Sequence, residues 1–388
     1  WRASPLSSLP TTPRTSLASR SSTLISPCTP ALPATVKSPS SLMLVSALPD
    51  AADALPFRLA ALALEGLWPA LEYLSGLDHS LWVQHTPRPW TLAAAAVGIA
   101  WLLAPRGFPA RWVGTLWLLP LFLIRPPAPA PGEVWFTLLD VGQGLSAVVR
   151  TAHHALVYDA GPRFSARFDA GRAAVAPFLR HAGIGRIDTL VISHGHNDHI
   201  GGAVSLIEAF PVGRIVSSVP QRLTGAEPCR AGESWEWDGV RLALLHPADD
   251  PRLRDNNLSC VLAVTGPYGR ILLPGDIAVA AERALVARAR EALRAEVLVV
   301  PHHGSKSSSS ALFIDAVRPE YALIPAGYRN AYRHPNAQVV ERYRSAGARL
   351  YGSAASGAIA VQLTAAGREV AAYRVDQARY WRTPPDVE

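Results

Sequence analysis

Three histidines and one aspartate lie within six consecutive positions of this chain. They are His194, His196, Asp198 and His199, which together form the pattern His-x-His-x-Asp-His. Neutral imidazoles and a carboxylate are ligands that divalent transition-metal ions prefer. An apolar run over residues 189–192 precedes them, and two glycines and a helical pattern follow. Because a strand that ends in a tight loop can direct several side chains at one centre, this context favours a metal-binding loop over a merely polar loop.

Two later segments place metal-type residues directly after apolar runs. Residues 271–273 lead into Asp276, and residues 297–300 lead into the adjacent pair His302 and His303. A lone Gly-Asp is usually a turn and a histidine pair usually lies on the surface. Here both stand at the predicted end of a buried strand, as the first loop does. We therefore expect one sheet edge to gather all three segments.

The combined set has the size of a site for two divalent ions. Its predicted ligands are His194, His196, Asp198, His199, Asp276, His302 and His303. We assign the first two to one ion and the next two to the other. Asp276 would bridge the two ions, and either His302 or His303 would complete the ligands of the second ion. Histidine-rich ligands favour zinc, whereas the carboxylates also allow manganese. Two such ions can activate water and polarise a phosphate oxygen.

The composition sets broad limits on the class of protein. Of 388 residues, 49% are hydrophobic and only 17% are charged, and the net charge is +7. The low charge indicates sequence in or beside a membrane, and the basic balance suits an acidic partner such as nucleic acid or anionic lipid. The cysteines, Cys28, Cys229 and Cys260, are far apart and form no Cys-x-x-Cys pair. Thiolate metal ligation and a disulfide framework are therefore not expected.

The first third of the chain differs from the rest. Residues 1–50 are rich in Ser, Pro, Thr and Ala and are predicted to be disordered, and the start at Trp1 suggests a fragment or an unnatural beginning. Residues 51–125 are predicted to hold an amphipathic helix, bent at Pro69, and two membrane helices over the apolar runs 91–104 and 112–124. A pair of buried core helices is the alternative.

A Pro/Ala linker over residues 126–132 marks a domain boundary, and residues 381–388 form a short tail. Between them, residues 133–380 show strand patterns that alternate with helical ones, twice over. This order is typical of an α/β domain with two packed sheets and helices outside.

The pattern at 194–199 resembles the signature of the metallo-β-lactamase superfamily. Five motifs together narrow the resemblance to the C-terminal domain of the ComEC family, the inner-membrane channel proteins of bacterial DNA uptake. These motifs are DVGQG (140–144), SHGHNDHIGG (193–202), NNLS (256–259), LLPGD (272–276) and VPHHGSKSSSS (300–310). The resemblance covers about residues 50–380. It implies a four-layer αββα sandwich and a channel portion with many more membrane helices, most of which this chain lacks.

The resemblance also implies supporting residues around the ligands. Asp159 matches an Asp-x-Gly that holds the metal loop by hydrogen bonds. Asp140, of the DVGQG motif, is expected in the same supporting or substrate-contacting shell. Asn257 and Ser259 are expected to contact substrate or water beside the first ion.

Three positions depart from the family patterns. His196 stands where family members often carry Asp, and Leu145 stands where many carry an acidic residue. The superfamily also commonly supplies one more histidine between the first loop and the bridging aspartate. His246 is the only histidine in that interval, and it is predicted to end a strand rather than to bind metal. The first ion is therefore expected to be under-liganded.

Candidate catalytic and phosphate-binding residues complete the predicted site. Asp198, His302 and His334 are the candidate catalytic residues, with His334 as a proton donor to the leaving oxygen. Ser305 and Lys306 stand beside the histidine pair, where they could hold backbone phosphates at a helix start. A plainer interpretation of the serine run is helix capping.

Three functions remain open from the sequence. The first is a metal-dependent nuclease that degrades the non-imported DNA strand, in single-stranded or double-stranded DNA, with the membrane, other uptake proteins and the missing channel portion as partners. The second is a hydrolase of a small ester or phosphoester on the same fold. The third is a non-catalytic domain that guides DNA. Two arginines in the loop over 105–111 suggest that this loop faces the cytoplasm and that the C-terminal domain lies outside the inner membrane.

Overall fold

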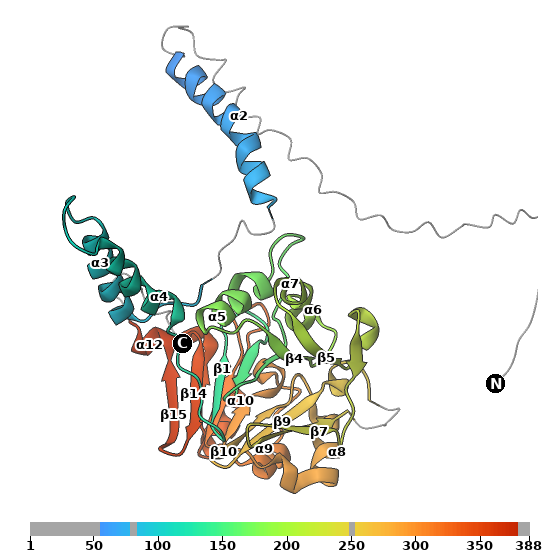
Figure 1. The fold of residues 1–388 in the computed structure, drawn as a ribbon. Coiled ribbons are helices and arrows are strands. Elements are labelled where there is room, and N and C mark those ends of the chain that lie inside the picture. The colour runs from blue at the N-terminus through green and yellow to red at the C-terminus, as the bar shows by residue number, and fades with distance from the viewer. Residues whose placement is uncertain (1–54, 78–83, 248–252, 379–388) are drawn as a thin grey trace, which may run out of the picture. The chain divides into compact units, whose positions relative to one another are not determined.

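The computed structural model describes residues 55–77, 84–247 and 253–378. The chain divides into two compact units, Trp1–Trp82 and Val83–Glu388. The described part of the first unit is the helix α2 (Leu55–Ser75), which contains Pro69 and has no buried residue (Figure 1). The predicted disordered segment 1–50 and the tail 381–388 lie outside the described residues.

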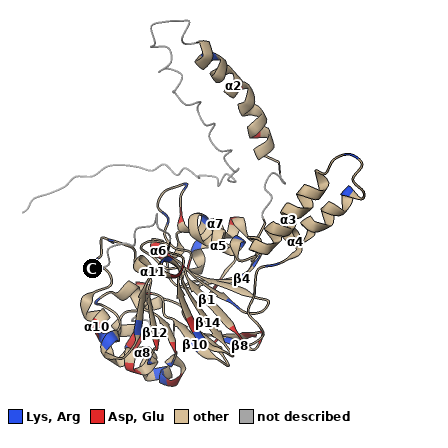
Figure 2. Cartoon of the chain, turned by 90° about the vertical axis from the view of Figure 1, so that its left-hand side faces the viewer, with Lys and Arg blue, Asp and Glu red and all other residues tan. Residues whose placement is uncertain are grey.

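A helical hairpin opens the second unit. It consists of α3 (Pro89–Leu102), the 3-10 helix η1 (Arg111–Leu118) and α4 (Leu119–Leu123). The two arms touch through glycines, because a Cβ on Gly98 would lie 2.6 Å from the carbonyl oxygen of Gly114. Figure 2 shows that the hairpin carries almost no charge except basic residues at its turn.

The predicted membrane helices over 91–104 and 112–124 are not found as spanning helices. The first run forms a 14-residue helix, which is about 21 Å long against a hydrocarbon core of about 30 Å. The second run is mostly the tighter 3-10 helix and then a five-residue helix that contains a proline. Across the described ranges, no helix combines the length and apolar character needed to cross a bilayer.

The first sheet holds the metal loop. Within the described residues its strand order is β15-β14-β1-β2-β3-β4-β5-β6. The strands are β1 (Val134–Leu138), β2 (Ala147–Arg150), β3 (Ala155–Tyr158), β4 (Ile187–Ile192), β5 (Val212–Ser217), β6 (Ala226–Pro228), β14 (Ile359–Thr364) and β15 (Gly367–Ala372). Neighbours from β15 to β3 pair antiparallel, and those from β3 to β6 pair parallel.

The second sheet is likewise antiparallel in one part and parallel in the other. Its order in the described chain is β13-β12-β11-β10-β9-β8-β7. The strands are β7 (Ser234–Trp237), β8 (Val240–His246), β9 (Val261–Gly266), β10 (Gly269–Leu273), β11 (Val297–Val299), β12 (Tyr321–Ile324) and β13 (Arg349–Gly352). From β10 to β13 the strands run parallel.

Three apolar cores define four layers. Alternate residues of both sheets, such as Phe136 and Leu262, meet in a core between the sheets. The outer face of the first sheet packs on η2 (Gly171–Val175), α5 (Ala176–His181) and α7 (Ala203–Ala209) (Figure 1). The outer face of the second sheet packs on α8 (Val279–Ala289), α9 (Ala311–Val317) and α10 (Ala337–Ser345). The predicted αββα sandwich is therefore confirmed.

The chemistry-bearing loops meet at one end of the sandwich, but not on one sheet edge as the sequence suggested. The metal loop follows β4 of the first sheet, whereas Asp276 and the histidine pair follow β10 and β11 of the second. Tyr158 crosses between the sheets just behind this end, donating its hydroxyl to the carbonyl oxygen of Cys260 at 2.6 Å. The centre is thus built from two facing sheets.

Candidate metal centre

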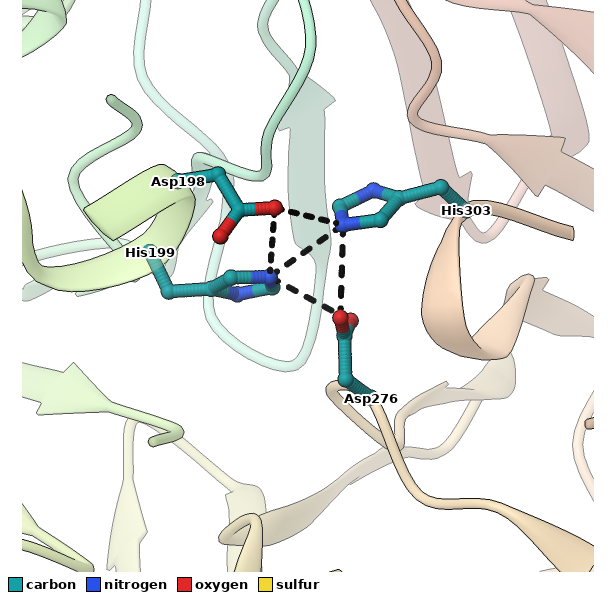
Figure 3. Close-up of side chains that lie close together, drawn as sticks. All are labelled: Asp198, His199, Asp276 and His303. Carbon is teal, nitrogen blue, oxygen red and sulfur yellow. Dashed lines mark hydrogen bonds and ion pairs between the residues drawn. The ribbon is translucent and has the colours of Figure 1, made fainter. Parts of the chain in front are cut away.

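Four side chains converge from both sheets on one point (Figure 3). Asp198 and His199 lie on the short helix α6 (Asn197–Ile200) after β4. Asp276 follows β10, and His303 lies in the turn η6 (Pro301–Gly304) after β11. One ligand atom from each of the four lies within 4.8 Å of the others. We call these four residues the tight cluster.

The distances in the tight cluster suit a cation at its middle. His303 Nε2 lies 3.1 Å from Asp198 Oδ2 and 3.3 Å from Asp276 Oδ2. His199 Nε2 lies 3.3 Å from Asp276 Oδ1 and 3.3 Å from His303 Nε2. Two ring nitrogens and two carboxylates thus face one another, and three of the four residues are buried. A divalent ion would accept electron pairs from all four groups at once.

The outer nitrogens of both histidines are held in place. His199 Nδ1 donates to Asp159 Oδ2 at 2.7 Å, and His303 Nδ1 donates to the carbonyl oxygen of Pro325 at 2.7 Å. Since the outer nitrogen keeps its proton, the inner Nε2 of each ring would present its lone pair to a metal ion that displaces the inner proton. Asp159 also accepts from the backbone nitrogen of Ser193 at 2.6 Å and from its hydroxyl at 2.7 Å. Asp159 therefore occupies the supporting position that the sequence predicted for it.

Charge coupling within the cluster is strong. Burial opposes the charged form of Asp198, but the hydrogen bond from His303 and the nearby His199 lower the pKa of Asp198 to about 2. Burial likewise opposes a charged His303, yet Asp276 and Asp198 raise the pKa of His303 to about 9. The pKa of His199 is raised, against burial, by Asp276 and Asp159. Positive charge is therefore favoured at the centre of the cluster, where a metal ion would replace these protons.

His194 and His196 form a more open corner beside the cluster. His194 is buried, and its Nε2 has no hydrogen-bond partner among the described residues. Burial and the neighbouring His199 lower the pKa of His194 to about 3, so this ring is neutral and its Nε2 is free to bind a metal. The same Nε2 lies 4.0 Å from Asp276 Oδ2. His196 is exposed, with its ring centroid 4.7 Å from that of His194. We call this pair the open corner.

His246 does not supply a third histidine to the open corner in this structure. It ends β8, and its Nε2 bonds the carbonyl oxygen of Asn257 at 2.7 Å. Burial lowers the pKa of His246. This position agrees with the strand-end interpretation of the sequence.

The histidine pair splits into two environments. His302 and His303 both adopt left-handed backbone angles, with φ of 53° and 55°. His303 joins the tight cluster, whereas His302 Nε2 lies 3.9 Å from Asp276 Oδ2 and is bonded by Asn256 Nδ2 at 3.3 Å. His302 Nδ1 contacts the hydroxyl of Ser307 at 3.2 Å. The geometry therefore favours His303 for the ligand position that the sequence left open.

His334 lies over the histidine pair. Its ring centroid is 6.1 Å from that of His302 and 6.5 Å from that of His303. Burial and the charges of His303 and His302 lower the pKa of His334, so the ring is neutral near pH 7. A neutral imidazole can still donate one ring N–H toward a leaving oxygen.

Two other predicted residues make contacts that the sequence did not indicate. Asn257 Oδ1 accepts from the backbone nitrogen of Ala278 at 3.0 Å, at the start of α8. Ser259 Oγ accepts from the backbone nitrogen of Asp276 at 3.2 Å. Both side chains thus fix backbone behind the site, and their contact with substrate or water stays a prediction.

The serine run also differs from its expected geometry. Helix α9 begins at Ala311 with Ser310 as its cap, so Ser305 and Lys306 precede the helix by several residues. Ser305 Oγ lies 3.0 Å from the hydroxyl of Ser307, and Lys306 is exposed. The expected phosphate site at a helix start is therefore not formed by these two residues.

The DVGQG segment packs directly against the metal loop. A Cβ on Gly144, whose φ is 148°, would lie 2.5 Å from the carbonyl oxygen of Asp198, so only glycine allows this approach. Asp140 Oδ2 accepts from Arg374 Nη2 at 2.7 Å. Sequence reasoning missed Arg374, because 234 positions separate it from its partner. Ser193 was also missed, although its position directly before His194 was a usable signal.

The fold and site agree with a match to a known family. Residues 139–328 match the model of the metallo-β-lactamase superfamily. The matched segment begins just before the DVGQG motif and includes the tight cluster and the open corner. Residues 139–328 are thus similar to the metallo-β-lactamase superfamily, whose fold implies divalent metal ions.

Similar proteins indicate a narrower class of protein. Competence protein ComA of Neisseria gonorrhoeae is 36% identical over 81% of this chain and 44% of its own length. Uncharacterized protein YcaI of Escherichia coli K12 is 34% identical over 74% of this chain and 37% of its own length. Recombination protein 2 of Haemophilus influenzae is 33% identical over 58% of this chain and 28% of its own length. The chain is thus similar to competence proteins of the ComEC type, and it spans less than half the length of each of these relatives.

Proposed function

We propose that this chain is a metal-dependent phosphodiesterase that cuts DNA during DNA uptake and degrades the strand that is not imported. The observation that carries the proposal is the tight cluster, in which two anchored imidazoles and two carboxylates face one point. The names of two relatives, a competence protein and a recombination protein, favour DNA over a small ester as the substrate. A net charge of +7 also suits a polyanion.

We propose that the chain acts at the bacterial inner membrane as part of a longer uptake protein, with the metallo-β-lactamase domain outside the cytoplasm. Its proposed partners are DNA, the membrane, other uptake proteins and the channel portion carried by the longer relatives. The support is the similarity to longer competence proteins.

The residues of the tight cluster and the open corner would hold two divalent ions, zinc or manganese. When bound, such ions activate water for attack and offset charge on a phosphate oxygen. The chain itself contributes the orientation of the ligands. Asp159 and the carbonyl oxygen of Pro325 fix which nitrogen of His199 and His303 carries the proton, so that neither ring must reorient during the reaction.

His334 is the candidate group for the leaving oxygen. Its ring centroid lies 6.5 Å from that of the buried His303 and 6.1 Å from that of His302. Because its pKa is lowered, the ring would start neutral and would donate a ring N–H to the leaving oxygen as a hydrogen bond. No serine or cysteine nucleophile is required.

A nuclease assay coupled to metal analysis tests the proposal. The 388-residue chain would be supplied with manganese or zinc and given end-labelled DNA oligonucleotides. We expect release of shorter fragments that is lost in His196→Ala and Asp276→Ala. Asp238→Asn is the matched control, because Asp238 lies in the β7–β8 turn at the opposite end of the strands.

Two outcomes would contradict the proposal in different ways. Cleavage of small esters such as p-nitrophenyl acetate, with no cleavage of DNA in either metal, would show a small-molecule hydrolase. Binding of DNA without cleavage in any divalent metal would show a domain that only guides DNA.

A further inference from the structure

Two surface loops beside the metal centre share an unusual composition. One loop, residues 163–168, reads Arg-Phe-Ser-Ala-Arg-Phe, and the other, residues 328–333, reads Tyr-Arg-Asn-Ala-Tyr-Arg. Each carries two aromatic and two basic residues and no acidic one. We call them the Arg-Phe loop and the Tyr-Arg loop. No step proposed above uses any of these aromatic side chains.

The aromatic rings of both loops are open to solvent. Phe164 and Phe168 are 56% and 53% exposed, and Tyr328 and Tyr332 are 45% and 69% exposed. Large apolar side chains that remain this exposed beside a functional site usually mark a binding surface. The alternating arginines indicate that the bound molecule is both aromatic and negatively charged.

The Arg-Phe loop is a closed hairpin fixed to the metal loop. The backbone nitrogen of Phe164 donates to the carbonyl oxygen of Phe168 at 2.9 Å, and the two rings lie 5.3 Å apart. At its base, Asn197 bonds the backbone of Arg163 twice, at 3.3 Å and 3.0 Å. Because Asn197 directly precedes Asp198, this hairpin is anchored to the helix that carries two members of the tight cluster.

The Tyr-Arg loop reaches the centre from the other sheet. The rings of Tyr332 and His334 stack 5.8 Å apart at 17°, and those of His334 and His303 stack 6.5 Å apart at 19°. Three nearly parallel rings thus lead from the buried cluster out to an exposed tyrosine. Asn330 closes this loop, since its Nδ2 donates to the carbonyl oxygen of Gly327 and its Oδ1 accepts from the backbone nitrogen of His334, each at 2.9 Å.

We propose that these two loops grip single-stranded DNA by stacking on unpaired bases on either side of the metal centre. Aromatic faces bind every base without regard to sequence, and arginines pair with the phosphates between them. In a duplex the bases already stack on one another, so their faces are closed to these side chains. The inference rests on the proposed function and adds to it that the substrate is a single strand, held by its bases as well as by its backbone.

The test compares a normal strand with one that has no bases. Fluorescence anisotropy would measure binding of the 388-residue chain to a 15-nucleotide oligo-dT and to an abasic oligonucleotide of equal length and charge, with metal chelated so that nothing is cut. We expect oligo-dT to bind about tenfold or more tightly than the abasic strand. Phe164→Ala with Phe168→Ala, or Tyr332→Ala, should remove that preference. Tyr332→Phe should keep it, and Arg167→Gln should weaken both strands alike.

Leu312→Ala is the matched control, because Leu312 is an exposed apolar residue on α9 outside both loops. Equal binding of the normal and abasic strands, or a preference that survives the loop variants, would overturn the inference. The inference would also be overturned if the loop variants lost binding to phosphatidylglycerol vesicles but kept binding to DNA, because the loops would then bind a lipid surface. If the chain bound the normal strand more tightly than the abasic strand but cut no DNA in any metal, the proposed function would be refuted and the inference about the loops would stand.

Discussion

The tight cluster and the open corner stand side by side but are built in different ways. In the tight cluster, both imidazoles are buried and have their outer nitrogens bonded to Asp159 and to the carbonyl oxygen of Pro325. In the open corner, His194 is buried with an unpartnered Nε2, and His196 is exposed. Asp276 is the carboxylate close to both, with oxygens 4.0 Å from His194 Nε2 and 3.3 Å from His199 Nε2.

The difference indicates that one metal position is organised before any ion binds and the other is not. Ligands locked by outer hydrogen bonds lose little freedom on binding, whereas an exposed histidine must be ordered at that moment. We therefore expect the two positions to bind metal with different affinities, the tight cluster first. Four experiments test whether the two positions differ in this way.

Removal of the shared carboxylate should have the largest effect. Asp276→Asn keeps the shape but removes the negative charge that faces His199 and His303. We expect loss of metal from both positions and a fall in DNA cleavage of more than about a hundredfold, since even outer-shell changes typically cost 10–100-fold. Metal content by mass spectrometry and initial cleavage rates would measure this. Retention of two ions in the variant would contradict the bridging role.

Loss of the carboxylate that holds the outer nitrogen of His199 should have the next largest effect on metal binding. Asp159→Asn replaces the charged acceptor of His199 Nδ1 and of the Ser193 hydroxyl. We expect the affinity of the tight cluster for metal to fall about 10–100-fold, because the amide no longer enforces the required tautomer. Titration against a coloured chelator gives the affinity. Unchanged affinity would show that packing alone orients the ring of His199.

Substitution of His196 should affect metal binding at the open corner alone. In His196→Ala we expect bound metal to fall from two ions to one per chain, with the affinity of the remaining ion little changed. The reason is that the side chain of His196 is exposed, and its link to the tight cluster is a backbone one, from His199 N to the carbonyl oxygen of His196 at 3.1 Å, which alanine keeps. Calorimetric titration gives both the stoichiometry and the affinity. Loss of both ions together would refute the independence of the two positions.

A substitution at the opposite end of the sandwich should have the smallest effect on metal binding. Burial opposes ionisation of Asp238, but hydrogen bonds from Thr151 and His153 hold its pKa well below the usual value. A depressed folded-state pKa adds stability above the unfolded pKa of about 3.9, and this stability is lost as pH falls below it. Asp238→Asn should therefore show a weaker loss of stability between about pH 4 and pH 2, with metal content unchanged. Urea unfolding across this pH range would reveal it, and an unaltered acid profile would contradict the assignment.

The sequence by itself determined the class of the domain and the types of its ligands. The His-x-His-x-Asp-His pattern needs only local spacing, and inner strands such as β3 and β11 appear as apolar runs because both of their faces are covered. The edge strands of the two sheets, β6, β7, β13 and β15, carry no such apolar run. Edge strands stay partly exposed, as the burial of β6 and β7 shows, so they lack the apolar signal that marks an inner strand.

Only the tertiary structure decided how the ligands are shared. It selected His303 over its neighbour His302, because two left-handed residues in a row aim adjacent rings in different directions. It directed His246 Nε2 to the carbonyl oxygen of Asn257, and it brought Arg374 to Asp140. These contacts join segments that are far apart in the chain or depend on backbone angles. Residue type and local spacing do not encode them, and they form only when the two sheets close on each other.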